Sequence, residues 1–187
     1  MQGRGRQWMN PHGVLQQVLS FADLYAGKMV AALDRQHPRD LFDIQCLLAK
    51  EGVSDTLFQT FLVYTLSRNR PAHEVLLPHL KDIKQAFEQE FVGMTTEETS
   101  LDILIAARAQ LILEIRSRLN ERTMRFLLSF HELKPDWALL ETPDISNLPA
   151  IRWKLMNLAL LQAKQPEKYR TMIHELEILL PNGRNWD

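Results

Sequence analysis

Seven charged side chains lie within the 28 residues from Ser20 to Leu47, between apolar residues that have helical spacing. Burying a charge costs free energy unless the charge is paired, hydrogen-bonded or bound to a ligand. Lysine and arginine bind phosphates, and carboxylates orient such cations. The segment therefore predicts either a network of ion pairs or a nucleotide site. Its charged residues are Asp23, Lys28, Asp34, Arg35, Arg39, Asp40 and Asp43.

The first half of this charged segment predicts a helix with two cations on one face. Lys28, Ala31, Ala32 and Arg35 have the spacing i, i+3, i+4 and i+7, so they share a face of that helix. Small residues between two cations would let a ligand approach the helix closely. We therefore expect this face to be open.

The second half predicts a helix that begins near Pro38 and carries Asp40 and Asp43 on one face. Asp40 falls in the first turn, where the helix dipole favours an anion. The connection at residues 36–38 is short enough to fold this helix back on the first. Lys28 and Arg35 could then meet Asp40 and Asp43. Charge clusters in helical proteins are usually structural ion pairs of this kind, so geometry alone favours the structural interpretation, with the nucleotide site as the alternative.

The rest of the chain predicts the elements that must position this cluster. Residues 1–13 hold three of the seven glycines and predict an irregular lead-in, and Val14–Leu19 could form a short strand. Nearly all of residues 14–187 then has helical period, which predicts one mainly α, multi-helix domain. Helices are expected at about 21–35, 38–52, 54–70, 80–91, 100–119, 121–133, 144–164 and 166–181, with short turns at 73–78 and 135–137.

Composition excludes several classes of protein. The chain has 187 residues, a net charge of −1, and no apolar run that approaches the roughly 18 residues of a membrane span. The basic start has no apolar stretch typical of a secretory signal, so we expect a cytoplasmic protein. The six histidines lack the spacing of metal ligands, and no Gly-rich phosphate loop is present.

The segment LSFADLYAGKMVAALDRQHPRDLFDI resembles a motif of the AbiEii-type nucleotidyltransferase toxins, the toxin half of type IV toxin–antitoxin systems. The family pattern is roughly D-L-x-x-x-K, a helix, R, and then R-D-x-x-D. Weaker resemblance continues through NRPAHEVLLP, FVGMT and LPAIRWKLMNL. The resemblance implies that Lys28 contacts the triphosphate and that Asp43 is a catalytic or site-organising carboxylate. It implies supporting roles for Asp40 as a second carboxylate and for Arg35 and Arg39 as nucleotide-binding cations.

The chain departs from this family in one respect. Such enzymes hold Mg²⁺ with a D-x-D pair that follows a G-S or G-T turn in an N-terminal α/β core, and the 187 residues contain no such motif. We therefore expect the helical C-terminal region of a nucleotidyltransferase, without about a hundred N-terminal residues, and inactive alone. The resemblance implies that the intact enzyme transfers a nucleotide from an NTP, with Mg²⁺, to an acceptor such as tRNA.

Two further expectations concern partners. The resemblance implies a cognate antitoxin, and an apolar patch left uncovered by an absent N-terminal core would favour a homodimer. The alternative to the transferase is a non-catalytic helical interaction domain in which the charged corner is only a structural joint.

Overall fold

The computed structural model describes residues 7–9, 15–17, 20–96, 99–140 and 145–179, and within these ranges the chain is mainly α, as predicted. Its helices surround a shared apolar core, which includes Met29, Phe61, Phe126 and Phe130. The helices are α1 (Phe21–Asp34), α2 (Pro38–Lys50), α3 (Asp55–Leu66), α4 (Ala72–Leu76), α5 (Lys84–Glu90), α6 (Leu101–Arg118), α7 (Glu121–His131), α8 (Pro149–Lys164) and α9 (Pro166–Ile178). Two 3₁₀ turns, η1 (Trp137–Leu139) and η2 (Ile145–Asn147), connect α7 to α8.

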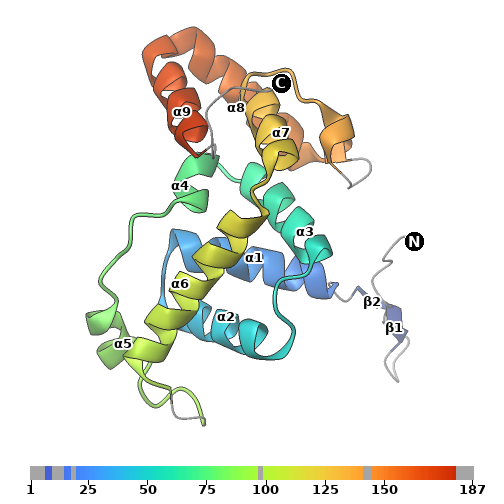
Figure 1. Cartoon of the computed structure of the whole chain (residues 1–187). Coiled ribbons are helices and arrows are strands. Elements are labelled where there is room, and N and C mark those ends of the chain that lie inside the picture. The colour runs from blue at the N-terminus through green and yellow to red at the C-terminus, as the bar shows by residue number, and fades with distance from the viewer. Residues whose placement is uncertain (1–6, 10–14, 18–19, 97–98, 141–144, 180–187) are drawn as a thin grey trace.

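The helices form two groups that meet at α3 and α4 (Figure 1). In the first group, α1 packs against α2 and α3, and α2 packs against the long helix α6. In the second group, α7, α8 and α9 pack on one another, and they contact the first group through α3 and α4. The charged segment forms α1 and α2 and so lies inside the first group.

Local caps explain where most helices begin. The side chains of Ser20, Ser54, Ser100 and Asn120 each accept a hydrogen bond from the backbone N–H three residues later, at the predicted starts of α1, α3, α6 and α7. Prolines stand at the first positions of α2, α8 and α9. Because caps of this kind are local, the sequence predicted these starts, except that of α8. That helix was expected from residue 144 but begins at Pro149, after the separate 3₁₀ turn η2.

The helix expected at 80–91 begins only at Lys84. The preceding backbone is held by distant side chains instead: the Lys81 N–H donates to Gln36 Oε1 at 3.0 Å, and the Lys81 carbonyl accepts from Arg108 at 2.9 Å. The Asp82 carboxylate then accepts from the Lys84 N–H at 2.9 Å, which starts α5. The expected helix was therefore too long at its N-terminal end.

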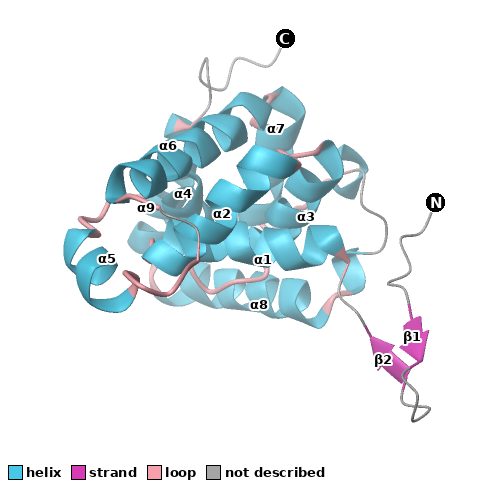
Figure 2. Cartoon of the chain, turned by 90° about the horizontal axis from the view of Figure 1, so that it is seen from below, coloured by secondary structure: helices cyan, strands magenta, loops and turns pink. Residues whose placement is uncertain are grey.

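A small antiparallel hairpin precedes α1 (Figure 2). Strand β2 (Leu15–Gln17) falls inside the predicted strand, and it pairs with β1 (Gln7–Met9), with Trp8 opposite Gln16. The segment expected to be irregular thus supplies the strand's partner. In the parts of the chain that the structure describes, no helix is both long and apolar enough to cross a membrane.

Candidate functional site

Lys28 and Asp43 form an ion pair across the corner between α1 and α2. The Lys28 Nζ lies 2.6 Å from Asp43 Oδ2, and the two side chains are 31% and 38% exposed. The contact predicted from the short connection is therefore present. Because both groups still reach solvent, an incoming anion can meet the ammonium without first being buried.

Arg35 and Asp40 form the second ion pair of this corner. The Arg35 guanidinium donates to Asp40 Oδ1 at 2.8 Å. Arg35 is 66% exposed, whereas Asp40 is largely covered at the start of α2. The other oxygen of that carboxylate, Oδ2, is buried and finds no hydrogen-bond partner within the described residues. The pair therefore joins an accessible cation to a largely buried carboxylate.

Arg39 lies on a different side of the corner. Its guanidinium donates to the Glu90 carbonyl at 3.4 Å, and the neighbouring His37 Nε2 lies 3.0 Å from Glu90 Oε2. These contacts tie the start of α2 to the end of α5. The structure thus brings Lys28, Arg35, Asp40 and Asp43 together in two pairs and directs Arg39 toward α5.

The small residues between the two cations are not open to a ligand. Ala31 and Ala32 are both buried, because α1 packs closely on its neighbours α2, α3, α4 and α6. The expectation that a ligand reaches the helix between Lys28 and Arg35 is therefore wrong. A ligand that reaches Lys28 must come from the exposed side of the ion pair.

The carboxylates of the corner do not by themselves fit a Mg²⁺ site. Mg²⁺ takes oxygen ligands, typically one or two carboxylates together with substrate phosphates. Asp43 and Asp40 each face a cation instead, Lys28 and Arg35 respectively. Across the described ranges, no three His, Cys, Asp or Glu side chains gather where they could hold a metal ion.

A buried polar centre at the end of α1 was not predicted. Gln36 is buried in a left-handed conformation with φ of 56°. Its amide donates to the His79 carbonyl at 2.7 Å, and its oxygen accepts from Arg108 at 2.9 Å. Burial lowers the pKa of Arg108, while the nearby Asp82 carboxylate raises it. The partners lie 43 and 72 residues away, so local sequence spacing holds no signal for them.

A buried lysine joins two segments of the family resemblance. Lys154, in LPAIRWKLMNL, donates to the carbonyls of Arg68, Asn69 and Arg70 at 2.8, 3.1 and 2.9 Å. The carbonyls of Asn69 and Arg70 belong to the start of NRPAHEVLLP, and Arg68 directly precedes it. Burial lowers the pKa of Lys154 to about 8, and the Glu74 carboxylate raises it. The two segments therefore contact each other at the junction of the helix groups, far from the Lys28 corner in sequence.

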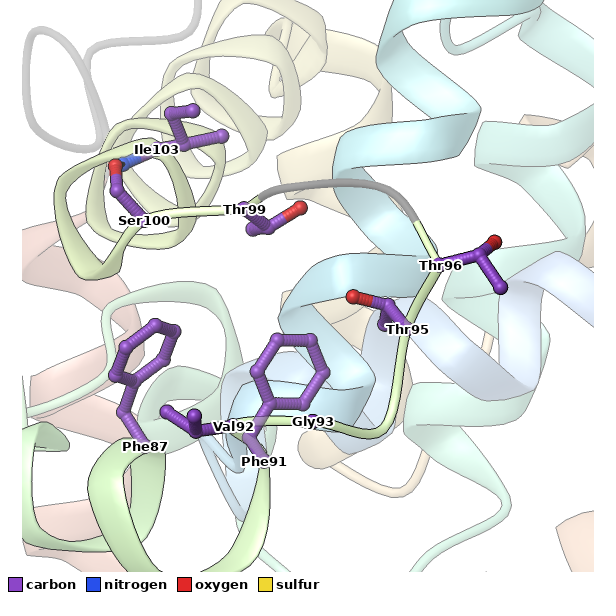
Figure 3. Close-up of a pocket in the computed structure, with 9 residues that line it drawn as sticks. All are labelled: Phe87, Phe91, Val92, Gly93, Thr95, Thr96, Thr99, Ser100 and Ile103. Carbon is purple, nitrogen blue, oxygen red and sulfur yellow. Dashed lines mark hydrogen bonds between the residues drawn. The ribbon is translucent and has the colours of Figure 1, made fainter.

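A pocket of about 540 Å³ lies between α5 and the start of α6 (Figure 3). Its lining is apolar and hydroxyl-bearing: Phe87, Phe91, Val92, Gly93, Thr95, Thr96, Thr99, Ser100 and Ile103. It contains no residue of the charged corner. With no cation among these lining residues, the pocket does not fit a triphosphate.

The comparisons with known proteins give one match. A family model described as "Nucleotidyl transferase AbiEii toxin, Type IV TA system" matches residues 7–186. No curated protein and no solved structure matches. The matched region includes the hairpin, the charged corner and both contact segments of Lys154.

Proposed function

The chain belongs to the AbiEii nucleotidyl transferase toxin family of type IV toxin–antitoxin systems, and on this basis we propose that its α1–α2 corner binds a nucleoside triphosphate. The observation that supports this most is the accessible Lys28–Asp43 pair. A lysine ammonium is a compact charge that binds phosphate oxygens. Arg35, which lies seven positions after Lys28, is exposed and paired with Asp40, and it is the second cation proposed to face the phosphates.

Asp43 has two roles in this proposal. Before nucleotide binds, its carboxylate holds the Lys28 ammonium in place at 2.6 Å. During transfer by the intact enzyme, the oxygen of an acceptor hydroxyl forms a bond to the α-phosphorus and pyrophosphate leaves. Asp43 is then the carboxylate proposed to take the proton of that hydroxyl, since a general base must lie beside the reacting group. Asp40 supports the corner through Arg35, and the nucleotide-binding role of Arg39 stays a prediction.

We further propose that these 187 residues bind the nucleotide without transferring it. The paired D-x-D carboxylates that the resemblance implies for Mg²⁺ are not among them, and the two carboxylates of the corner already face cations. The metal-binding half would then come from residues outside this sequence. A tRNA acceptor is proposed for the intact enzyme only, and the type IV family implies a cognate antitoxin as its partner.

The first test is calorimetric titration of the full chain with each NTP in the presence of Mg²⁺. We expect binding that Lys28→Ala abolishes and that Lys50→Ala, an exposed lysine at the end of α2, leaves unchanged. Transfer of labelled NMP and release of pyrophosphate should stay at background in the same samples. NTP binding that does not depend on Lys28 would contradict the proposed site, and transfer above background would contradict the proposed inactivity.

The second candidate is a non-catalytic interaction domain in which the ion pairs only fix the corner. The two pairs do join α1 to α2, which is what a structural joint requires. Breaking a buried pair would cost about 3–5 kcal/mol, whereas an exposed pair contributes about 0–1 kcal/mol. Lys28 and Asp43 are one-third exposed, so we expect Lys28→Ala to unfold at nearly the wild-type urea concentration. A large loss of stability without any NTP binding would favour the structural candidate.

A further inference from the structure

An aromatic pair lies on the same helix face as Lys28. Phe21, Leu24, Tyr25 and Lys28 have the spacing i, i+3, i+4 and i+7, so they share one side of α1. The rings of Phe21 and Tyr25 have centroids 4.6 Å apart at an interplanar angle of 44°. The Lys28 Nζ lies 5.7 Å from the centre of the Tyr25 ring. This face therefore runs from two rings to a cation that is already paired with Asp43.

The ring end of this face is open. Phe21 is 47% exposed and Leu24 is 45% exposed, although both are large apolar residues. Tyr25 is the inner ring of the pair, and it is partly buried and packs against the core. The buried face of Ala31 and Ala32 excludes an approach on the other side of Lys28. The exposed Phe21 ring and Leu24 thus form the surface that adjoins Lys28 along α1 toward its N-terminus.

The chemistry of this face matches the two ends of a nucleotide. Lys28 lies seven residue steps after Phe21 in the α-helix, a rise of about 10 Å along the axis. A nucleotide likewise presents a flat aromatic base at one end and phosphates at the other. Bases stack on exposed aromatic side chains, and the contact tolerates any base because every base has a π face. The phosphates would meet the ammonium of Lys28.

We propose that the Phe21–Tyr25 ring pair receives the base of the nucleotide whose phosphates Lys28 binds. This inference rests on the proposed function and adds the part of the ligand that Lys28 and Asp43 do not contact. Phe21 supplies the open ring surface, and Tyr25 supports that ring from the side of the core. Stacking alone predicts a site that holds purines more tightly than pyrimidines but excludes neither.

The test compares ATP with inorganic triphosphate, which has the phosphates and no base. Dissociation constants are measured for the full chain and for Phe21→Ala, Phe21→Trp and Lys28→Ala. Met156→Ala, which truncates an exposed apolar residue of α8, is the matched control. Circular dichroism and urea unfolding show that each variant is folded.

We expect Phe21→Ala to weaken ATP binding by about 5- to 100-fold, which corresponds to one lost stacking contact. Triphosphate binding should not change, Phe21→Trp should keep ATP affinity, and Lys28→Ala should weaken both ligands. Unchanged ATP affinity in Phe21→Ala, with both ligands still dependent on Lys28, would overturn the stacking inference and leave the proposed function standing. So would an equal loss for ATP and triphosphate, which would indicate a structural effect.

The remaining outcomes test the proposed function itself, and whether the ring pair binds the base of the nucleotide or a base of an acceptor strand. If neither ligand binds, or if Lys28→Ala binds both normally, the proposed function fails and the inference fails with it. A single-stranded oligoadenylate with no triphosphate gives the last comparison. If Phe21→Ala weakens the oligonucleotide and not ATP, the ring pair serves an acceptor strand, and the inference about the bound nucleotide is overturned.

Discussion

The side-chain oxygen of Gln36 accepts a hydrogen bond from the guanidinium of Arg108 at 2.9 Å, although 72 residues separate the two in the chain. The same oxygen accepts from the Lys81 N–H at 3.0 Å. The Lys81 ammonium in turn donates to the carbonyls of Asp34 and Arg35, at 3.0 and 3.3 Å, where α1 ends. One amide therefore ties the end of α1 to the segment before α5 and to α6. These hydrogen bonds fix the end of α1, and so they support the α1–α2 corner that carries Lys28 and Asp43.

Replacing Gln36 should separate its side-chain and backbone contributions. We expect Gln36→Ala to lower the free energy of unfolding by about 2–4 kcal/mol, because buried partners lose their hydrogen bonds. Gln36→Gly loses the same bonds but relieves the left-handed backbone, so it should be about 1 kcal/mol more stable than the alanine variant. Urea unfolding measures both, with the exposed Gln85→Ala as control. Equal stability of the two variants would show that the positive φ carries no strain.

Removing the buried ammonium of Lys154 should destabilise the junction of the two helix groups. Lys154→Met keeps the length of the side chain but leaves the carbonyls of residues 68–70 without their donor. We expect a loss of about 2–5 kcal/mol. Lys164→Met, an exposed lysine in the last turn of the same helix, should change stability by less than about 0.5 kcal/mol. Similar urea midpoints for the two variants would contradict this account.

His131 should make the fold sensitive to acid. Its Nδ1 lies 2.7 Å from the Leu127 carbonyl, which only accepts, so Nδ1 carries the proton, while the buried Nε2 has no partner among the described residues. Burial lowers the pKa of His131 to about 4; the backbone bond raises it, and the positive charges of Lys154 and His73 lower it further. Protonation would therefore place a second N–H at a position where the described residues offer no acceptor.

The sign of this effect follows from proton uptake. Between pH 6.5 and about 4 the unfolded chain binds a proton at His131 that the folded chain does not, so stability falls as the pH drops through this window. The loss at His131 approaches about 3 kcal/mol near pH 4. Burial also lowers the pKa of His73, which acts in the same direction. His131→Phe should flatten the profile between pH 7 and 4, whereas the exposed His174→Phe should not.

The space around Gly27 would also accommodate an alanine side chain. A Cβ added at this position in α1 would lie 3.5 Å from the Tyr64 ring, which is ordinary van der Waals contact. Glycine within a helix is about 0.5–1 kcal/mol less stable than alanine. We therefore expect Gly27→Ala to raise the free energy of unfolding by about that amount, measured by urea. A lower stability would contradict the expectation that the added methyl group fits beside the Tyr64 ring. Unchanged NTP binding would show that the glycine next to Lys28 has no role in the site.

The features that could be predicted from the sequence are those that depend on residues close together in the chain. Ser20, Ser54 and Asn120 cap helices through hydrogen bonds to their own first turns, so those starts are visible in the chain itself. The Lys28–Asp43 and Arg35–Asp40 pairs follow from two helices joined by a short connection.

What the sequence did not predict depends on contacts distant in the chain. Ala31 and Ala32 are small and lie between cations, and nothing in their spacing shows that other helices cover them. Gln36 and Lys154 bond to carbonyls 43 and 86 residues away, so only the folded chain reveals their partners. Contacts distant in the chain also explain why α5 begins later than its sequence pattern indicates, because Gln36 and Arg108 hold the backbone at Lys81.

The bond from Lys154 to the Arg68 carbonyl also bears on the order in which the chain matures. On the ribosome, residues 68–70 emerge long before α8, because synthesis runs from the N-terminus. Until α8 arrives, these three carbonyls lack the hydrogen bonds that they accept from Lys154 in the folded protein. We therefore expect the nascent chain to stay vulnerable to proteases at this turn until α8 docks. The turn at residues 68–70 would then reach its final hydrogen bonding only after Lys154 has been synthesised.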